Sequence, residues 1–144
     1  MKPSPKGWPR ISVSLFYDDA ATAIDWLRRA FDFEVQMKVE GEGGRIEHSQ
    51  LVYGDGLIMV SSTGRDERSH KYVSPISQDG KVTQSLCIFV DDVDAHCERA
   101  RSAGATIGDE PKTTDYGEEY WTDRGYRAVD PEGHHWWFMQ RLRG

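Results

Sequence analysis

The chain has 144 residues, of which 38% are hydrophobic and 29% are charged. This length fits one ordinary domain, and no apolar run approaches the roughly 18 residues that a membrane-spanning helix needs. The net charge of −6 disfavours nucleic acid and anionic membranes as partners, so we expect a single globular domain over residues 1–144 that binds neither.

The first half of the chain predicts the element order β-α-β-β-β. Apolar and small residues alternate from Ile11 to Tyr17, which is typical of a strand with one buried face. Asp18 and Asp19 then precede apolar residues at helical spacing up to Phe31, a pattern that favours a capped amphipathic helix. Three further strands are predicted over residues 33–40, 45–53 and 56–62, separated by glycine-rich turns.

The second half repeats this order. A strand over 85–90 precedes Asp91 and Asp92, which are again followed by a helical pattern, and an apolar strand follows Gly133. The capping residues Asp19 and Asp92 lie 73 positions apart, which indicates two copies of one βαβββ unit. Residues 106–123 have weak periodicity and predict an altered or shortened strand.

We therefore divide the domain into module one at about 10–62, a connector at 63–83 and module two at about 84–141. The connector is polar and longer than most loops, so it is either a mobile link or a lid.

The N-terminal segment and the two cysteines predict a cytoplasmic protein. Residues 1–10 lack the apolar core of a secretory signal. Only Cys87 and Cys97 are present, which favours free thiols in a reducing compartment over a disulfide framework.

Four segments together resemble the vicinal oxygen chelate superfamily, which contains glyoxalases, bleomycin-resistance proteins and extradiol dioxygenases. These segments are SLFYDDAATAIDWLRRAFDF, IEHSQLVYGDGLIMV, FVDDVDAHCERARSAGATI and DPEGHHWWF. The resemblance implies an α+β fold in which two tandem βαβββ modules form a strongly bent, cup-shaped mixed sheet. It also implies helices packed outside, a ligand site inside the cup, and a homodimer.

The resemblance places metal ligands on the first and last strand of each module. Alignment from the capping aspartates and from Gly56 and Gly133 puts these positions at Ser12, Ser85, Val60 and Trp137. None of these side chains is a good ligand for a divalent metal, so we expect neither a metal nor another cofactor. An alignment slip would recruit only His48, Gln50, His134 or His135, which leaves a non-standard divalent metal site as an alternative.

The same alignment suggests which side chains line the ligand site. His48 and Gln50 share one face of their strand, and His48 is either a general base or a structural histidine. Trp137 suits stacking against a planar or cationic ligand, whereas Trp136 and Phe138 are expected to face a helix. The complete predicted set of ligand-binding residues is Ser12, Ser14, Phe16, His48, Gln50, Val60, Ser85, Cys87, Tyr126 and Trp137. Tyr126 is favoured over Arg127 as the inward-facing residue of its strand.

These features favour a protein that binds, and sequesters, a cationic or aromatic small molecule without a metal. One alternative is an enzyme of the glyoxalase or dioxygenase kind, with a non-standard metal or metal-free site around His48. Another is a regulatory module whose connector binds a partner. The fold alone does not choose among the three.

Overall fold

The computed structural model describes residues 1–64 and 71–144, so part of the predicted connector lies outside the described residues. The chain divides into two compact units, unit 1 over Met1–Ser74 and unit 2 over Pro75–Gly144. The boundary between them falls inside the predicted connector. None of the helices in the described ranges is long and apolar enough to cross a bilayer.

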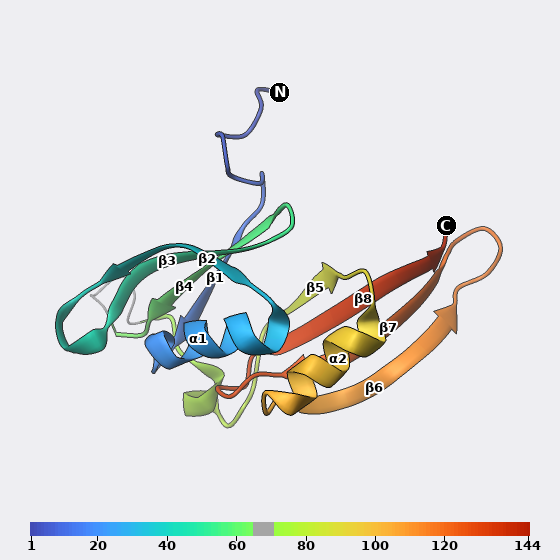
Figure 1. The fold of residues 1–144 in the computed structure, drawn as a ribbon. Helices are drawn as coiled ribbons and strands as arrows, with labels where there is room; N and C mark the ends of the chain where they lie inside the picture. Colours follow the sequence, from blue (N-terminus) through green and yellow to red (C-terminus); the bar gives the residue numbers. More distant parts are fainter. Residues whose placement is uncertain (65–70) are drawn as a thin grey trace. The chain divides into compact units, whose positions relative to one another are not determined.

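Unit 1 has the predicted β-α-β-β-β order (Figure 1). Its elements are β1 (Val13–Tyr17), α1 (Ala20–Phe31), β2 (Glu34–Glu40), the short 3-10 helix η1 (Glu42–Gly44), β3 (Ile46–Tyr53) and β4 (Gly56–Ser62). The strands form one mixed sheet in the order β1-β4-β3-β2, in which β1 and β4 are parallel and the other pairs are antiparallel.

Unit 2 repeats this topology, which confirms the predicted duplication and the α+β class. Its elements are η2 (Pro75–Gln78), β5 (Ser85–Phe89), α2 (Val93–Ser102), β6 (Thr106–Asp115), β7 (Thr122–Val129) and β8 (His135–Arg143). The sheet order is β5-β8-β7-β6, with β5 and β8 parallel.

The strand after α2 is altered, as predicted, but it is not shortened. β6 is ten residues long, although its pairing with β7 shifts register between Ile107 and Asp109 and again before Lys112. These irregularities change which side of the sheet each residue faces, and this explains the weak periodicity of the sequence.

Both predicted helix caps are confirmed. The side chain of Asp19 accepts a hydrogen bond from the backbone N–H of Thr22, and that of Asp92 accepts one from Ala95. Each carboxylate satisfies an N–H group that has no partner within the helix, so each helix begins where the sequence indicates.

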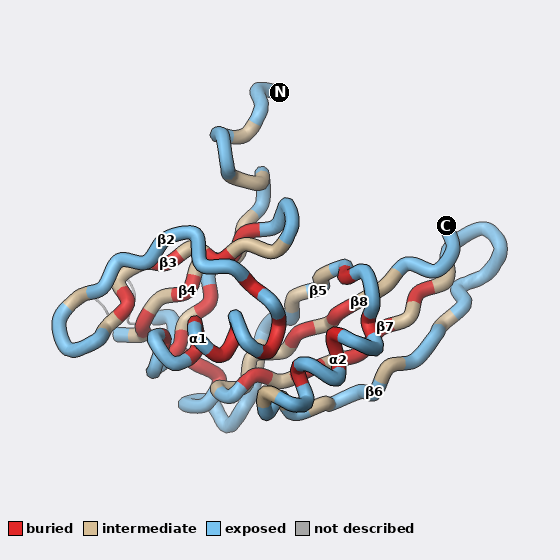
Figure 2. The backbone as a smooth tube through the Cα atoms, viewed as in Figure 1, coloured by how far each residue is buried: buried red, intermediate tan, exposed pale blue. Residues whose placement is uncertain are grey.

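Each helix covers one face of its own sheet and buries the apolar residues there. In unit 1, α1 contacts β1, β2 and β4, and Leu15 and Leu51 are fully buried. In unit 2, α2 contacts β6, β7 and β8, and Trp136 and Phe138 are fully buried as predicted. Figure 2 shows buried segments along α2, β7 and β8. The opposite face of each sheet carries no α-helix in the described ranges; we call it the open face of that unit.

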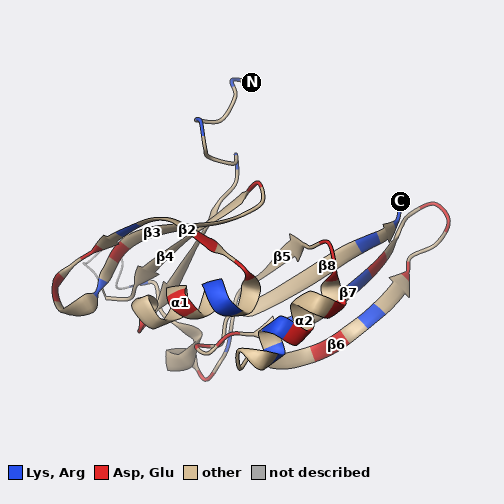
Figure 3. Ribbon diagram, viewed as in Figure 1, with Lys and Arg blue, Asp and Glu red and all other residues tan. Residues whose placement is uncertain are grey.

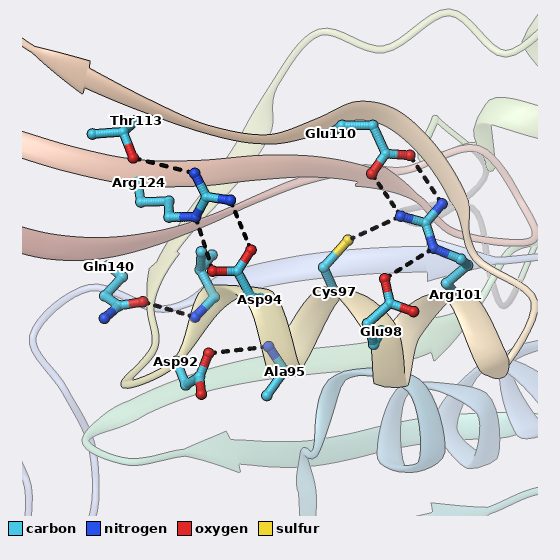
Figure 4. A network of polar contacts seen from close by, with 11 residues as sticks. Asp92, Asp94, Ala95, Cys97, Glu98, Arg101, Glu110, Thr113, Arg124 and Gln140 are labelled. Carbon is cyan, nitrogen blue, oxygen red and sulfur yellow. Dashed lines mark hydrogen bonds and ion pairs between the residues drawn. The ribbon is translucent and has the colours of Figure 1, made fainter.

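Charged residues tie α2 to the neighbouring strands on the helix side of unit 2 (Figures 3 and 4). Arg124 donates through Nε and Nη2 to the two carboxylate oxygens of Asp94, at 2.9 and 2.8 Å, and through Nη1 to Thr113. Arg101 donates through its two terminal nitrogens, Nη1 and Nη2, to the two carboxylate oxygens of Glu110. These pairs are partly exposed, so they orient α2 more than they stabilise it.

The turn before β8 is built around one buried carboxylate. Asp130 is 4% exposed and accepts hydrogen bonds from the backbone N–H groups of Glu132 and His134. Its second oxygen accepts from the indole N–H of Trp136 at 3.1 Å. Because this indole is fully buried, loss of the acceptor would leave a polar N–H group without a partner.

We expect Asp130→Ala to lower the free energy of unfolding by about 2–4 kcal/mol, since it removes charge-assisted hydrogen bonds and leaves buried donors unpaired. Chemical denaturation measures this change. Asp91→Ala is the matched control: Asp91 is exposed and lies in the same unit, so its effect should stay within about 0.5 kcal/mol. Equal effects for the two variants would contradict the proposed role of Asp130.

Candidate functional site

The open face of unit 1 mixes polar with apolar side chains. Strand register and burial place six residues on it: Ser14, Phe16, His48, Gln50, Met59 and Ser61. The central row runs from Ser14 on β1 through Met59 on β4 and Gln50 on β3 to Met37 on β2.

His48 and Gln50 lie together on this face, on the same side of β3 as their alternation suggests. Gln50 Nε2 and His48 Nε2 are 3.0 Å apart and form a hydrogen bond. Between them, Ser49 points the other way and its hydroxyl donates to the carbonyl of Val60. The pair is half-buried, which leaves polar atoms on the open face.

Phe16 carries an aromatic partner from the described part of the connector. The ring of Tyr72 stacks on that of Phe16 with centroids 4.5 Å apart and an interplanar angle of 12°. Tyr72 is 53% exposed. The connector therefore extends the aromatic surface of this open face. The prediction of a lid or mobile link over 63–83 also involves residues 65–70, which lie outside the described residues.

Val60 does not lie on the open face. It is fully buried and pairs with Leu15, whose side chain faces α1. Its neighbour Met59 pairs with Ser14 and occupies the expected position. The alignment from Gly56 and Gly133 is off by one residue in module one, because β4 begins at Gly56 whereas β8 begins two residues after Gly133.

Ser12 lies just before β1 and is half-buried. Its hydroxyl oxygen is buried and has no hydrogen-bond partner within the described part of the chain. In unit 2 the corresponding Ser85 is exposed and begins β5. The two serines therefore differ in environment, although the duplication relates them.

The open face of unit 2 is different in character. Its central row runs from Cys87 on β5 through Trp137 on β8 and Arg127 on β7 to Asp109 on β6. His135 and Met139 flank Trp137 on the same side of β8, because the intervening Trp136 and Phe138 are fully buried on the helix side. This face thus combines a half-buried indole with an ion pair.

Tyr126 lies on the helix side rather than on the open face. It is fully buried, and its hydroxyl lies 2.6 Å from Nδ1 of His96 on α2. Its ring stacks on Phe138 with centroids 5.3 Å apart. The buried partner on α2 satisfies the phenol, so Tyr126 packs inside and Arg127 takes the open face.

Arg127 is held by two neighbours. Its Nε donates to Asp109 Oδ2 at 2.6 Å, and its Nη1 lies 3.0 Å from Nδ1 of His135. A guanidinium has no acceptor, so Nδ1 of His135 must accept and the proton of the neutral ring must be on Nε2. Burial, and secondarily the charge of Arg127, lower the pKa of His135 from its ordinary value. His135 is therefore neutral at pH 7.

The exposed thiol of Cys87 is not activated. Its partial burial, and secondarily the negative charge of Asp123, raise the pKa of the thiol. The group therefore stays protonated at neutral pH, and a thiol rather than a thiolate is a poor nucleophile. Cys97 is also a free cysteine and is buried.

No cluster of three or more His, Cys, Asp or Glu side chains suited to a metal occurs among the described residues. His48 lies beside Gln50, and His135 is engaged with Arg127 through Nδ1.

Arg127 and Asp109 lie on the open face, although the sequence did not predict them there. The orientation of Arg127 can be inferred from its neighbour Ala128. Ala128 is small and fully buried, and it pairs with Trp136 on the helix side. Alternation then places Arg127 next to Trp137. Asp109 carries no comparable signal, because the irregular pairing of β6 hides its orientation.

We expect Arg127→Met to raise the pKa of His135 towards its ordinary value, since it removes a nearby positive charge and its N–H donor. Proton NMR titration of the histidine rings measures this change. Arg124→Met, on the helix side of the same strand, is the matched control and should leave the titration of His135 unchanged. An unaltered His135 titration in Arg127→Met would contradict the assigned contact.

The lowered pKa of His135 also fixes the sign of its effect on stability. Since the folded pKa lies below the unfolded one, the unfolded chain takes up this proton first as the pH falls below about 6.5. The contribution of neutral His135 to stability is thus present above that pH and is lost as the pH falls through the folded pKa.

Comparisons with known proteins agree with this architecture. An uncharacterized protein of Mycobacterium tuberculosis is 34% identical over 135 residues, which cover 94% of this chain and 76% of that protein. The crystal structure of TioX from Micromonospora sp. ML1 is 33% identical, with a TM-score of 0.70 over 93% of this chain and 99% of that one. FosX, a fosfomycin resistance protein from Listeria monocytogenes, shares the fold at 13% identity, with a TM-score of 0.64 over 92% of each chain.

The family model for the glyoxalase/bleomycin resistance protein/dioxygenase superfamily matches residues 11–138, which span both βαβββ modules and both open faces. The chain belongs to the glyoxalase/bleomycin resistance protein/dioxygenase superfamily.

Proposed function

We propose that this protein binds a small aromatic molecule on the open face of unit 2 and sequesters it without a metal. The observation that carries the proposal is the position of Trp137. Its ring stands on a sheet face without a helix, between Cys87 and Arg127 on the two paired strands.

Trp137 differs from the other tryptophan of β8 in what it contacts. Trp136 is fully buried and bonded to Asp130, so it is a core residue. Trp137 is only half-buried, and its neighbours across the strands supply no aromatic ring. An indole that the fold does not need for its core is well suited to stack on a planar ligand.

The protonation states on this face favour binding over chemistry. Cys87 is a protonated thiol and His135 is engaged through Nδ1 with a permanent cation. A general base requires a free ring nitrogen as acceptor, which this arrangement does not offer. The homodimer and the cup that the resemblance implies stay predictions, as does the cytoplasmic location.

We expect naphthalene, quinoline or indole compounds to raise the melting temperature and to change the tryptophan fluorescence of the wild-type protein. Trp137→Ala should weaken the tightest of them about tenfold, which corresponds to roughly 1.4 kcal/mol of lost stacking and burial. Trp8→Ala, in the segment before β1, is the control and should bind like wild type. No stabilisation across the panel, or unchanged binding by Trp137→Ala, would refute the proposal.

The alternative is an enzyme with a non-standard metal site around His48. The specific observation in its favour is that His48 and Gln50 present polar atoms together on the open face of unit 1. Metal analysis of protein purified without chelators separates the two functions. We expect substoichiometric zinc, nickel, manganese and iron, and no change in metal content for His48→Ala. A stoichiometric metal that is lost in His48→Ala would overturn the first proposal.

A further inference from the structure

The guanidinium of Arg127 is fixed in place on the open face of unit 2. Besides its bonds to Asp109 and His135, it lies directly against Gly108: a Cβ atom at position 108 would collide with the terminal nitrogens of Arg127. The side chain of Arg127 is only 24% exposed. The close contact with Gly108 and the two hydrogen bonds therefore hold the planar guanidinium in place before a ligand binds. This reduces the entropy cost of binding.

The guanidinium of Arg127 still has N–H groups that can donate hydrogen bonds to a ligand. In Arg124, on the helix side of the same strand, Nε and both terminal nitrogens are all bonded, to Asp94 and Thr113. In Arg127 only Nε and Nη1 are used. Within residues 1–64 and 71–144, the side chain of Arg127 has no bond at Nη2, and each terminal nitrogen carries two N–H groups.

Two neighbours of Arg127 add to its binding potential: His135 offers a second hydrogen-bond donor, and Trp137 offers an aromatic ring. Because Nδ1 of His135 accepts from Arg127, its Nε2 carries the proton and is itself a donor. Trp137 pairs directly with Arg127 across the strands. Planar donors beside an indole complement a planar acceptor attached to an aromatic ring.

We propose that the ligand of this open face is an aromatic carboxylate, whose carboxylate oxygens accept from the terminal nitrogens of Arg127 while its ring stacks on Trp137. This inference rests on the proposed small-molecule function and deepens it. It replaces the cationic ligand considered from the sequence, since a cation would meet the positive charge of Arg127 beside the indole.

The negative charge of Asp109 does not cancel the preference of Arg127 for a carboxylate. Its carboxylate is 52% exposed and bonds to Nε, the inner nitrogen of the guanidinium. A ligand carboxylate on the terminal nitrogens touches donors directly, whereas its repulsion by the more distant and exposed Asp109 is screened by water.

Three probes with one ring system test the charge preference in the wild-type protein: 2-naphthoate, 2-naphthamide and 2-naphthylmethylammonium. We expect calorimetry to show 2-naphthoate binding at least about tenfold tighter than the neutral amide, with the cation weakest. Equal binding of acid and amide would overturn the carboxylate assignment and leave the proposed function standing. Failure of all three to bind would count against both. Tighter binding of 2-naphthyl phosphate by more than about tenfold would also overturn the carboxylate.

Two variants test whether Arg127 is the source of the preference. Arg127→Met should bind acid and amide equally, while Arg124→Met, the matched control, should keep the wild-type preference. Gly108→Ala keeps the charge of Arg127, but its methyl group would displace the guanidinium from its present position. This variant should therefore lose most of the preference for the acid and still bind the amide like wild type. A wild-type preference for the acid in Arg127→Met would refute the assignment, and a wild-type preference in Gly108→Ala would refute the role of the contact with Gly108. Circular dichroism checks that each variant is folded.

Discussion

The alternation of side chains along β8 determines what the open face of unit 2 presents, and one buried hydrogen bond fixes that alternation. The indole N–H of Trp136 donates to Asp130, which also holds the preceding turn. A slip of one residue would carry Trp136 out of the core and leave Asp130 without this donor, at a cost of several kcal/mol. Trp137 is therefore directed to the open face, and strand pairing brings Cys87 and Arg127 to its sides.

The features that could be predicted from the sequence are those set by residues close together in the chain. Asp19 and Asp92 cap their helices by accepting hydrogen bonds from residues three positions further along the chain. Such short-range contacts follow from recognisable sequence patterns. The choice between Tyr126 and Arg127 is not local. Both are amphipathic, and the buried contact of the Tyr126 hydroxyl with His96 on α2 decides which of them faces inward. Such a contact between separate elements has no periodic signal in the sequence.

The duplication preserves the fold while the open faces diverge. In unit 1 the central row is Ser14, Met59, Gln50 and Met37, and in unit 2 the equivalent positions are Cys87, Trp137, Arg127 and Asp109. The helix caps and the apolar helix-facing positions are retained in both units. Because a residue of an open face contributes little to the core, it is free to change without loss of stability. The two central rows therefore differ in chemistry: the row of unit 1 carries no charged side chain, whereas that of unit 2 contains the ion pair of Arg127 and Asp109 beside an indole.

One fold accommodates metal sites and sites for organic ligands because the open-face side chains can change while the sheet is kept. The resemblance places metal ligands on the first and last strands of each module, and the sequence alignment puts them at Ser12, Val60, Ser85 and Trp137. The side chains that pair on the open faces of these strands are Ser14 with Met59 and Cys87 with Trp137. Exchanging a ligand histidine for an indole at such a position leaves the strand pairing intact, because backbone bonds and the buried neighbours maintain the register. What the sheet binds then depends only on the side chains of the open face. In unit 2 these side chains are the indole of Trp137 and the donors of Arg127 and His135, and the proposal of an organic anion as the ligand rests on them.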